Sequence, residues 1–275
     1  MKRVVVTLTD SSYYHKVKRT IADIRSRGEW TEDLVLITVG FDAPRNFLDF
    51  HRVISFRIEH IDTSHLLEQY RLCPIRPTCD NREFGKLTQW DKFAVFDRWF
   101  KQWDRVIFFD AGMRIVDSIH YLADLPCEGV FMAPDDCAPY DENGVFSKII
   151  EVDRNPPVVE QLFKEYPQDI LKRRYFLNCI WMYDTALLDT ITYSDLVQAM
   201  NRYPICRCNE MTIMNLIFTM KHNVWRPFPE WVENKAGQKK RLFGWSECND
   251  HYGHHNTWRN FCFLKYAQSI NFECE

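Results

Sequence analysis

Three aspartates, each standing directly after a short apolar stretch, have the clearest capacity for chemistry. Asp10, Asp110 and Asp135 all follow stretches rich in β-branched or aromatic residues. A carboxylate in such a place can accept hydrogen bonds from hydroxyl groups, or can coordinate a hard divalent cation that bridges phosphate oxygens. The structural alternative is an aspartate that only caps the turn after a strand.

The stretch Asp110-Ala111-Gly112 is the most specific of these places. A buried strand delivers one carboxylate to a turn, and Gly112 lets another group approach the backbone closely. Taken alone, the pattern fits a turn-capping aspartate at least as well as a cation ligand.

Alternating strands and helices must position these aspartates. The apolar patterns predict strands and helices in turn along the first half, and a less regular second half. The predicted strands are 3–8, 33–39, 53–58, 105–109, 129–132 and 179–183. The predicted helices run from Ser11 or Ser12 to Arg27, and over 86–101, 158–172, 185–200 and 210–220.

This order predicts an α/β fold with a Rossmann-like, mostly parallel sheet flanked by helices. In such sheets ligands bind beyond the carboxyl ends of the strands. Because Asp10, Asp110 and Asp135 all stand at such ends, we expect them to face one cleft. No repeat or linker divides the sequence, so a single domain over residues 1–275 is the simplest organisation.

Composition excludes several classes of function. The formal net charge of -3 gives no basic excess, which argues against binding nucleic acid by bulk electrostatics. The apolar run near the N-terminus is short and closed by Asp10, so no signal peptide and no membrane span is predicted. The cysteines are scattered without a Cys-x-x-Cys pair, which favours reduced thiols and a cytoplasmic protein.

Six segments, in order along the chain, resemble motifs of the GT-A glycosyltransferases. The likeness is to the glycogenin- and galactosyltransferase-like group, a retaining, family 8-like group. The segments are 6–10 with Tyr14, 86–90, 110–112, 176–180, 210–215, and 251–253 with Trp258. The resemblance covers most of the chain and implies a GT-A nucleotide-diphospho-sugar transferase. Residues of about 1–135 would then bind the nucleotide-sugar, and about 136–275 would form the acceptor side.

The resemblance also implies a set of donor-binding residues. A UDP-sugar carrying galactose or glucose is the default donor of this group, and the acceptor would be a glycan or glycoprotein. Lys86 would face the donor's diphosphate, although a solvated lysine at a helix start is the structural alternative. The full set is Thr7, Thr9, Asp10, Tyr14, Lys86, Asp110, Ala111, Gly112 and Asp135.

The same resemblance implies metal and catalytic residues. Asp110 would hold Mn²⁺ or Mg²⁺ together with His251, or else His254, and Glu210 and Asn178 would line the reacting sugar. The metal loop departs from the Asp-x-Asp pattern, because Gly112 replaces its second aspartate. Trp225, Trp231 and Trp245 would form an acceptor platform or, more simply, pack in the core.

Two rival functions belong to different classes. A catalytically silent nucleotide-sugar-binding module is motivated by Gly112. A sugar-1-phosphate nucleotidylyltransferase would need a Gly-rich phosphate loop after the first strand, and residues 7–14 contain no glycine. Metal-assisted glycosyl transfer is therefore the prediction, with the silent module as its alternative.

Overall fold

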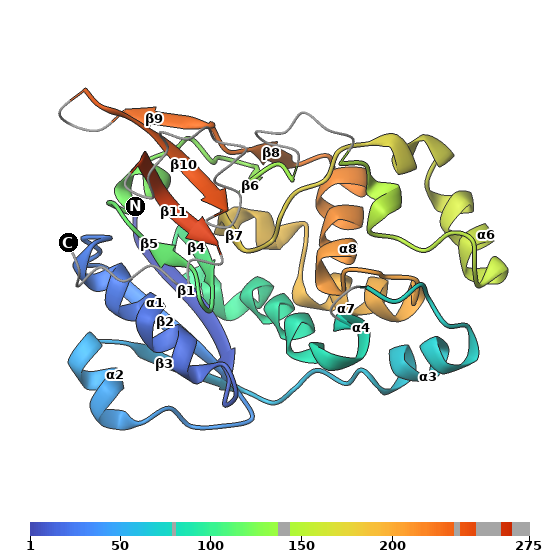
Figure 1. The fold of residues 1–275 in the computed structure, drawn as a ribbon, viewed down its shortest axis with the longest axis horizontal. Coiled ribbons are helices and arrows are strands. Elements are labelled where there is room, and N and C mark those ends of the chain that lie inside the picture. The colour runs from blue at the N-terminus through green and yellow to red at the C-terminus, as the bar shows by residue number, and fades with distance from the viewer. Residues whose placement is uncertain (79–80, 137–143, 234–236, 246–259, 266–275) are drawn as a thin grey trace.

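The structure of the protein, a computed structural model, describes residues 1–78, 81–136, 144–233, 237–245 and 260–265. A seven-stranded sheet forms its centre, in the order β3-β2-β1-β4-β7-β6-β8 (Figure 1). Its strands are β1 (Arg3–Asp10), β2 (Asp33–Val39), β3 (Ile54–Ile58), β4 (Arg105–Asp110), β6 (Phe131–Ala133), β7 (Ile180–Asp184) and β8 (Trp225–Pro227).

The central strands β1, β2 and β4 are parallel and almost wholly buried. Their β-branched and aromatic side chains suit a sheet that is covered on both faces. In the register of β1 with β4, Leu8 pairs with Asp110, so the carboxyl ends of these two strands lie at one edge of the sheet. The fold therefore brings Asp10 and Asp110 together, as the sequence predicts.

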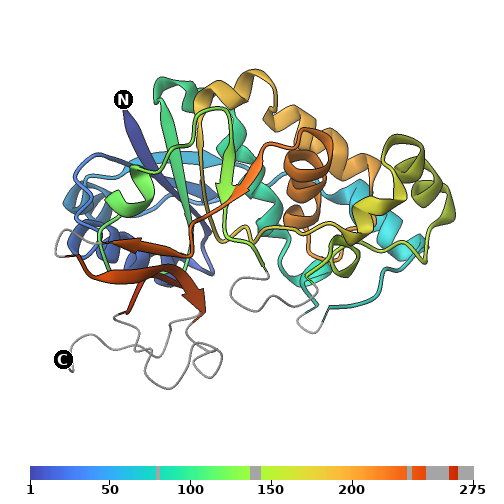
Figure 2. The same cartoon turned by 90° about the horizontal axis from the view of Figure 1, so that it is seen from above.

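A second, four-stranded sheet has the order β5-β11-β10-β9. Its strands are β5 (Arg114–Ile115), β9 (Trp231–Glu233), β10 (Lys239–Trp245) and β11 (Phe261–Lys265). Because β5 follows β4 closely and pairs with β11, a late segment of the chain lies beside the loop that follows Asp110. Figure 2 shows this sheet at one side of the central sheet, away from the large group of helices.

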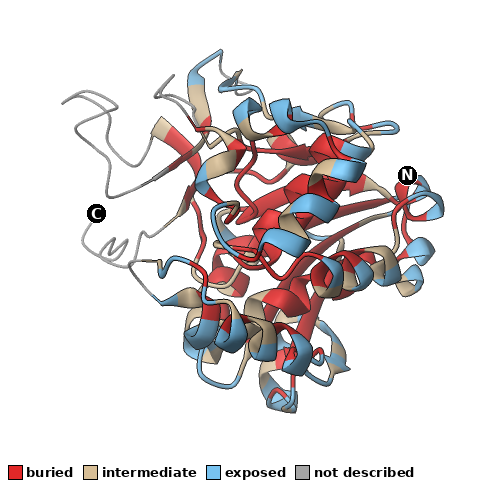
Figure 3. Cartoon of the chain, turned by 90° about the vertical axis from the view of Figure 1, so that its right-hand side faces the viewer, coloured by how far each residue is buried: buried red, intermediate tan, exposed pale blue. Residues whose placement is uncertain are grey.

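Helices cover both sides of the central sheet. Figure 1 shows α1 and α2 at one end and α3, α6, α7 and α8 gathered at the other, and Figure 3 shows that exposed residues lie mainly on the outer faces of helices. The α-helices are α1 (Tyr14–Ser26), α2 (Arg45–His51), α3 (Ser64–Leu72), α4 (Arg82–Gly85), α5 (His120–Ala123), α6 (Pro156–Glu165), α7 (Tyr193–Arg202) and α8 (Glu210–Met214).

Tighter and wider helical turns connect these elements. The 3-10 segments are η1 (Leu87–Phe96), η2 (Arg98–Gln102), η3 (Phe146–Lys148), η4 (Gln168–Lys172) and η5 (Thr185–Asp189), and a π-helix, η6 (Asn215–Lys221), continues α8. No helix among the described residues is long and apolar enough to cross a membrane. The cysteines whose side chains are described carry free thiols.

The predicted α/β class with a mostly parallel sheet is confirmed, and several predicted elements differ in detail. The predicted α-helix over 86–101 is instead the 3-10 pair η1 and η2. The helix predicted over 158–172 begins earlier, at Pro156, because proline is well suited to the first turn of a helix. Strand β7 runs antiparallel to β4 and β6, so the sheet is mixed.

The prediction of a single domain stays a prediction. Buried apolar residues from both halves of the chain nevertheless form one hydrophobic cluster, which includes Val5 and Phe108 of the central strands and Met214 of α8. That shared core holds the strands of the first half against the helices of the second half.

Arg105, at the start of β4, is a buried cation that joins three segments. Its Nε lies 2.6 Å from Oδ1 of Asp184 on β7, and its Nη1 donates to the carbonyl oxygens of Ala123 and Leu125. Removing this side chain would leave a mostly buried carboxylate and two carbonyl groups without a donor.

We expect Arg105→Ala to lower the free energy of unfolding by about 3 kcal/mol, because breaking one side of a buried ion pair leaves the other charge uncompensated. Urea denaturation at neutral pH measures this. The control is Arg98→Ala, which removes an exposed arginine from the neighbouring segment and should change stability by less than about 0.5 kcal/mol. Equal effects of the two substitutions would contradict the assignment.

Candidate active site

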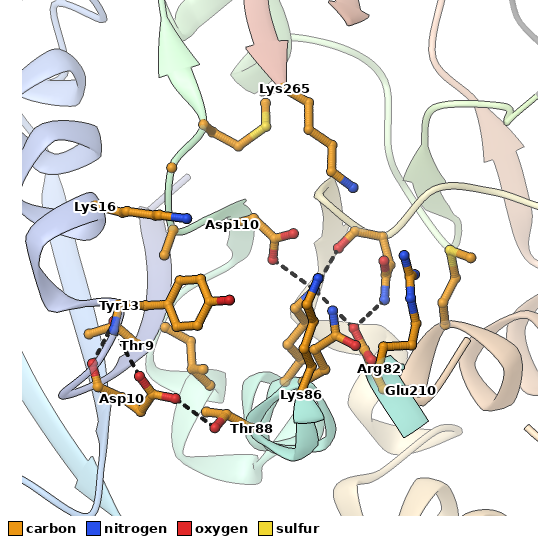
Figure 4. A pocket seen from close by; sticks show the side chains of 18 of the residues that line it. Thr9, Asp10, Tyr13, Lys16, Arg82, Lys86, Thr88, Asp110, Glu210 and Lys265 are labelled. Atoms are coloured by element: carbon orange, nitrogen blue, oxygen red, sulfur yellow. Dashed lines mark hydrogen bonds and ion pairs between the residues drawn. The ribbon is translucent and has the colours of Figure 1, made fainter. Parts of the chain in front are cut away.

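A cavity of about 390 Å³ opens where β1 and β4 end (Figure 4). Its lining comes from the end of β1, the start of α1, the α4–η1 segment, the loop after β4, and residues near β7, α8 and β11. The lining residues are Leu8, Thr9, Asp10, Ser12, Tyr13, Lys16, Arg82, Gly85, Lys86, Thr88, Gln89, Lys92, Asp110, Ala111, Gly112, Met113, Asp136, Leu177, Asn178, Cys208, Glu210, Met211 and Lys265.

Lys92 lies at the centre of the polar contacts of this cavity. Its ammonium Nζ is 2.7 Å from Oδ1 of Asp110 and 2.9 Å from Oε1 of Glu210, and its side chain is only 7% exposed. It also donates to the carbonyl oxygen of Asn178. Burial by itself lowers the pKa of Lys92, but the two carboxylates outweigh it, so its pKa is raised and the side chain stays charged.

Glu210, the first residue of α8, has a buried carboxylate whose two oxygens differ in their hydrogen bonding. Its Oε1 accepts from Nδ2 of Asn178 at 2.6 Å as well as from Lys92. Its Oε2 is buried and has no hydrogen-bond partner among the described residues. Burial raises the pKa of Glu210, and Lys92 opposes that shift in part.

Asp10 is held by three donors at the other side of the cavity. Its Oδ1 accepts from the hydroxyl of Ser12 and the backbone N–H of Tyr13, and its Oδ2 accepts from the hydroxyl of Thr88 at 2.7 Å. Burial raises the pKa of Asp10, but these hydrogen bonds outweigh it and the net pKa is lowered. Asp10 is therefore a fixed anion that ties the end of β1 to η1.

The 3-10 geometry of η1 selects which side chains reach the cavity. With three residues per turn, side chains spaced by three lie on one line along the helix. Lys86, which precedes η1 directly, and then Gln89 and Lys92 follow this spacing, and all three line the cavity. In an α-helix, Lys92 would point well away from Lys86.

The cavity is rich in cationic groups. Among the described residues its lining contains five basic side chains, against the acidic side chains of Asp10, Asp110, Asp136 and Glu210. The basic residues come from separate elements and are Lys16, Arg82, Lys86, Lys92 and Lys265. Figure 4 shows Lys16 and Lys265 reaching in from opposite sides of Asp110. Such a cavity suits an anionic ligand.

The structure brings most of the predicted site residues together. The residues that line the cavity as expected are Thr9, Asp10, Lys86, Asp110, Ala111, Gly112, Asn178 and Glu210. The two predicted histidine ligands of the metal, His251 and His254, lie outside the described residues. The sequence did not single out Lys92, Tyr13 or Lys265. A lysine inside the apolar η1 segment is the one signal that could have identified Lys92.

Three predicted donor-binding residues do not line the cavity. Thr7 is fully buried, because it lies two residues deeper in β1 than Thr9. Tyr14 packs edge-on against Phe41 and Phe47, and its neighbour Tyr13 faces the cavity instead.

Asp135 is the third of these residues. It forms an ion pair with Arg174 at 2.9 Å, and the next residue, Asp136, lines the cavity in its place. Trp225 and Trp231 of the predicted aromatic platform are also not part of this lining, and the side chain of Trp245 lies outside what the structure describes. Trp225 packs against Phe176, and Trp231 stacks with Arg241.

The described residues do not by themselves make a divalent-metal site. Asp110 shares its Oδ1 with the ammonium of Lys92, and Gly112 supplies no side chain. Within the described ranges no group of three His, Cys, Asp or Glu side chains is arranged to hold a metal ion. The predicted metal at Asp110 therefore stays a prediction.

We expect Lys92→Met to lower the free energy of unfolding by about 3–5 kcal/mol at pH 7, because two carboxylates lose their buried counter-charge. Without Lys92 the raised pKa of Glu210 rises further above its unfolded value. The folded variant then binds more protons than the unfolded chain above about pH 4.5, so its stability falls as pH rises through that window.

Urea denaturation at pH 7 and pH 5 measures this, and part of the loss should be recovered at pH 5. Lys101→Met is the matched control, since Lys101 forms a solvent-exposed ion pair with Asp189 and should contribute less than about 1 kcal/mol. A loss in Lys92→Met that does not change with pH would contradict the electrostatic role.

Comparison with known proteins adds independent information on the fold. The sequence matches no protein-family model, and it matches no curated protein. Among solved structures, an active-site mutant of LgtC aligns with 96% of this chain and 86% of its own, at 10% identity and a TM-score of 0.60. LgtC is also described as a galactosyltransferase in complex with donor and acceptor sugar analogs.

Two other similar structures belong to the same class of fold. The bifunctional glycosyltransferase WbbM aligns with 97% of this chain at 14% identity and a TM-score of 0.57, and this chain spans 46% of WbbM. The mannosyltransferase Ktr4p of S. cerevisiae, in complex with GDP, aligns with 82% of this chain and 68% of its own at 9% identity, with a TM-score of 0.51. At these identities the likeness is one of fold: the chain has the GT-A fold of glycosyltransferases.

Proposed function

We propose that the protein is a glycosyltransferase that moves a hexose, galactose or glucose, from a UDP-sugar to a hydroxyl group of a glycan or glycoprotein. The observation that supports this most directly is the basic cavity at the carboxyl ends of β1 and β4. This is the edge where sheets of this kind bind their ligands, and a nucleotide-sugar presents both a diphosphate and hydroxyl groups to such a cavity.

The cationic side supports departure of the nucleoside diphosphate. Negative charge grows on the diphosphate as the bond to the sugar breaks, and fixed positive groups stabilise it more in the transition state than in the ground state. Lys16 of α1, Lys86 between α4 and η1, and Lys265 of β11 line the cavity and suit this task.

On the other side of the cavity, the carboxylate of Glu210 suits the reacting sugar. The anomeric carbon gains positive charge in the transition state, and a buried carboxylate beside it is stabilising. Glu210 is positioned by Asn178 and Lys92, and its Oε2, which has no partner within the described part of the chain, matches a hydroxyl donor of the sugar. Retention of configuration follows only from the resemblance to the retaining group and is part of the proposal.

The nucleoside has a separate place near the end of β1. Asp10 and Thr9 lie there with Tyr13, whose ring is partly exposed, and this combination offers hydrogen bonds and an aromatic face to a base and ribose. The acceptor would approach from the side formed by the second half of the chain, where Leu177, Cys208 and Met211 line the cavity.

A catalytically silent nucleotide-sugar-binding module is the second candidate. Gly112, which leaves the loop after Asp110 with one carboxylate, favours it. A screen of UDP- and GDP-sugars that measures nucleoside diphosphate release separates the two functions. Release from one donor, even slow and without acceptor, supports the enzyme, whereas tight binding of a nucleotide without release from any donor supports the silent module.

We expect Glu210→Gln to lower donor turnover by about 10²–10³-fold, because the neutral amide no longer stabilises positive charge on the sugar. Its donor affinity should change much less. The control is Glu151→Gln, which also removes a buried carboxylate. That carboxylate lies outside the cavity lining and accepts hydrogen bonds from the backbone N–H groups of Arg76 and Asp153. If both variants turn over donor at the parent rate, Glu210 has no catalytic role.

A further inference from the structure

The carboxylate of Asp110, at the end of β4, already contacts a cation that is part of the protein, the ammonium group of Lys92. The Lys92 ammonium lies 2.7 Å from Oδ1 of Asp110 and is fixed there by Glu210 and the carbonyl oxygen of Asn178. A divalent ion on the same oxygen would lie beside a buried positive charge and be repelled by it. Lys92 therefore opposes metal binding at Asp110.

The loop itself offers no second carboxylate. Gly112 has φ of +93°, a conformation that residues with side chains rarely adopt. Its backbone N–H donates to the hydroxyl of Thr20 at 3.0 Å, and the same hydroxyl donates to the carbonyl oxygen of Met113. The loop is thus tied to α1 in a shape selected for glycine. Magnesium and manganese prefer several oxygen ligands, which the described part of the loop does not supply.

Three lysines bring positive charge into the cavity from separate parts of the chain. Lys16 comes from α1, Lys86 from the end of α4, and Lys265 from β11. Figure 4 shows the Lys16 and Lys265 side chains on opposite sides of Asp110. A lysine ammonium is an effective point charge for phosphate oxygens, so these groups can perform the neutralisation that a metal would otherwise provide.

We propose that this cavity binds the diphosphate of its donor without a divalent cation, through the ammonium groups of Lys16, Lys86 and Lys265, with Lys92 permanently occupying the cation position beside Asp110. The inference rests on the proposed function, because it takes a nucleoside diphosphate as the ligand. It departs from the metal dependence that the resemblance to GT-A enzymes implies.

The test compares nucleotide binding with and without metal. Protein freed of divalent ions with EDTA is titrated with UDP and with GDP by calorimetry, first in EDTA and then with saturating manganese. We expect one nucleotide to bind with the same Kd in both conditions, within about twofold. A Kd that is at least about tenfold weaker in EDTA, and is restored by manganese, would overturn the inference while leaving the proposed function intact.

Lysine variants test the other half of the inference in EDTA. Lys16→Met and Lys265→Met should each weaken binding of that nucleotide by about tenfold or more, because each removes one charge from the diphosphate. Lys18→Met is the matched control: it removes an exposed lysine from the same helix as Lys16, outside the cavity lining, and should keep the parent Kd.

Circular dichroism melting confirms that the variants are folded. If the folded Lys16→Met and Lys265→Met variants bind the nucleotide with the same Kd as Lys18→Met, the assignment of the diphosphate site to these lysines is wrong. If neither nucleotide binds under any condition, the proposed function fails, and the inference fails with it.

Discussion

The cavity depends on the two ion pairs that the ammonium group of Lys92 forms with Asp110 and Glu210. The fold places the carboxylates of Asp110 and Glu210 close enough to share one counter-ion, and two buried carboxylates without one would repel each other and lose their hydration. Lys92 resolves this by bonding both. Because Asp110 ends a central strand and Glu210 begins a helix of the second half, the same contact also fixes the distance between the two walls of the cavity.

The unusual helix η1 makes that contact geometrically available. A 3-10 helix of this length is uncommon, since its hydrogen bonds are poorer than those of an α-helix. Its threefold spacing aligns Lys86, Gln89 and Lys92 on the cavity side, and Trp90, Phe93 and Phe96 are fully buried in the core. Residues that face the cavity and residues that face the core therefore each recur at intervals of three along this segment. Asp10 supports the arrangement through its hydrogen bond from Thr88.

Sequence patterns predicted the central strands well, because buried runs such as that of β2 carry their signal locally. They could not predict the antiparallel direction of β7 or the pairing of β5 with β11, since both depend on partners distant in the chain. Most of the residues that the GT-A resemblance implies line the cavity, but at Tyr14 and Asp135 the neighbouring residue, Tyr13 or Asp136, lines it instead. Lys92 was not predicted as a site residue, because the α-helix predicted over 86–101 would point its side chain away from that of Lys86.

The pairing of β5 with β11 has a consequence for how the protein matures on the ribosome. Strand β5 leaves the exit tunnel early, yet its partner β11, which brings Lys265 to the cavity, is among the last described segments to emerge. Until then β5 has an unpaired edge, and the central sheet can already form from β1, β2, β3 and β4. Nascent chains would therefore form the sheet edge where β1 and β4 end well before the cavity wall that carries Lys265, so that an incomplete chain lacks one of the charges that line the cavity.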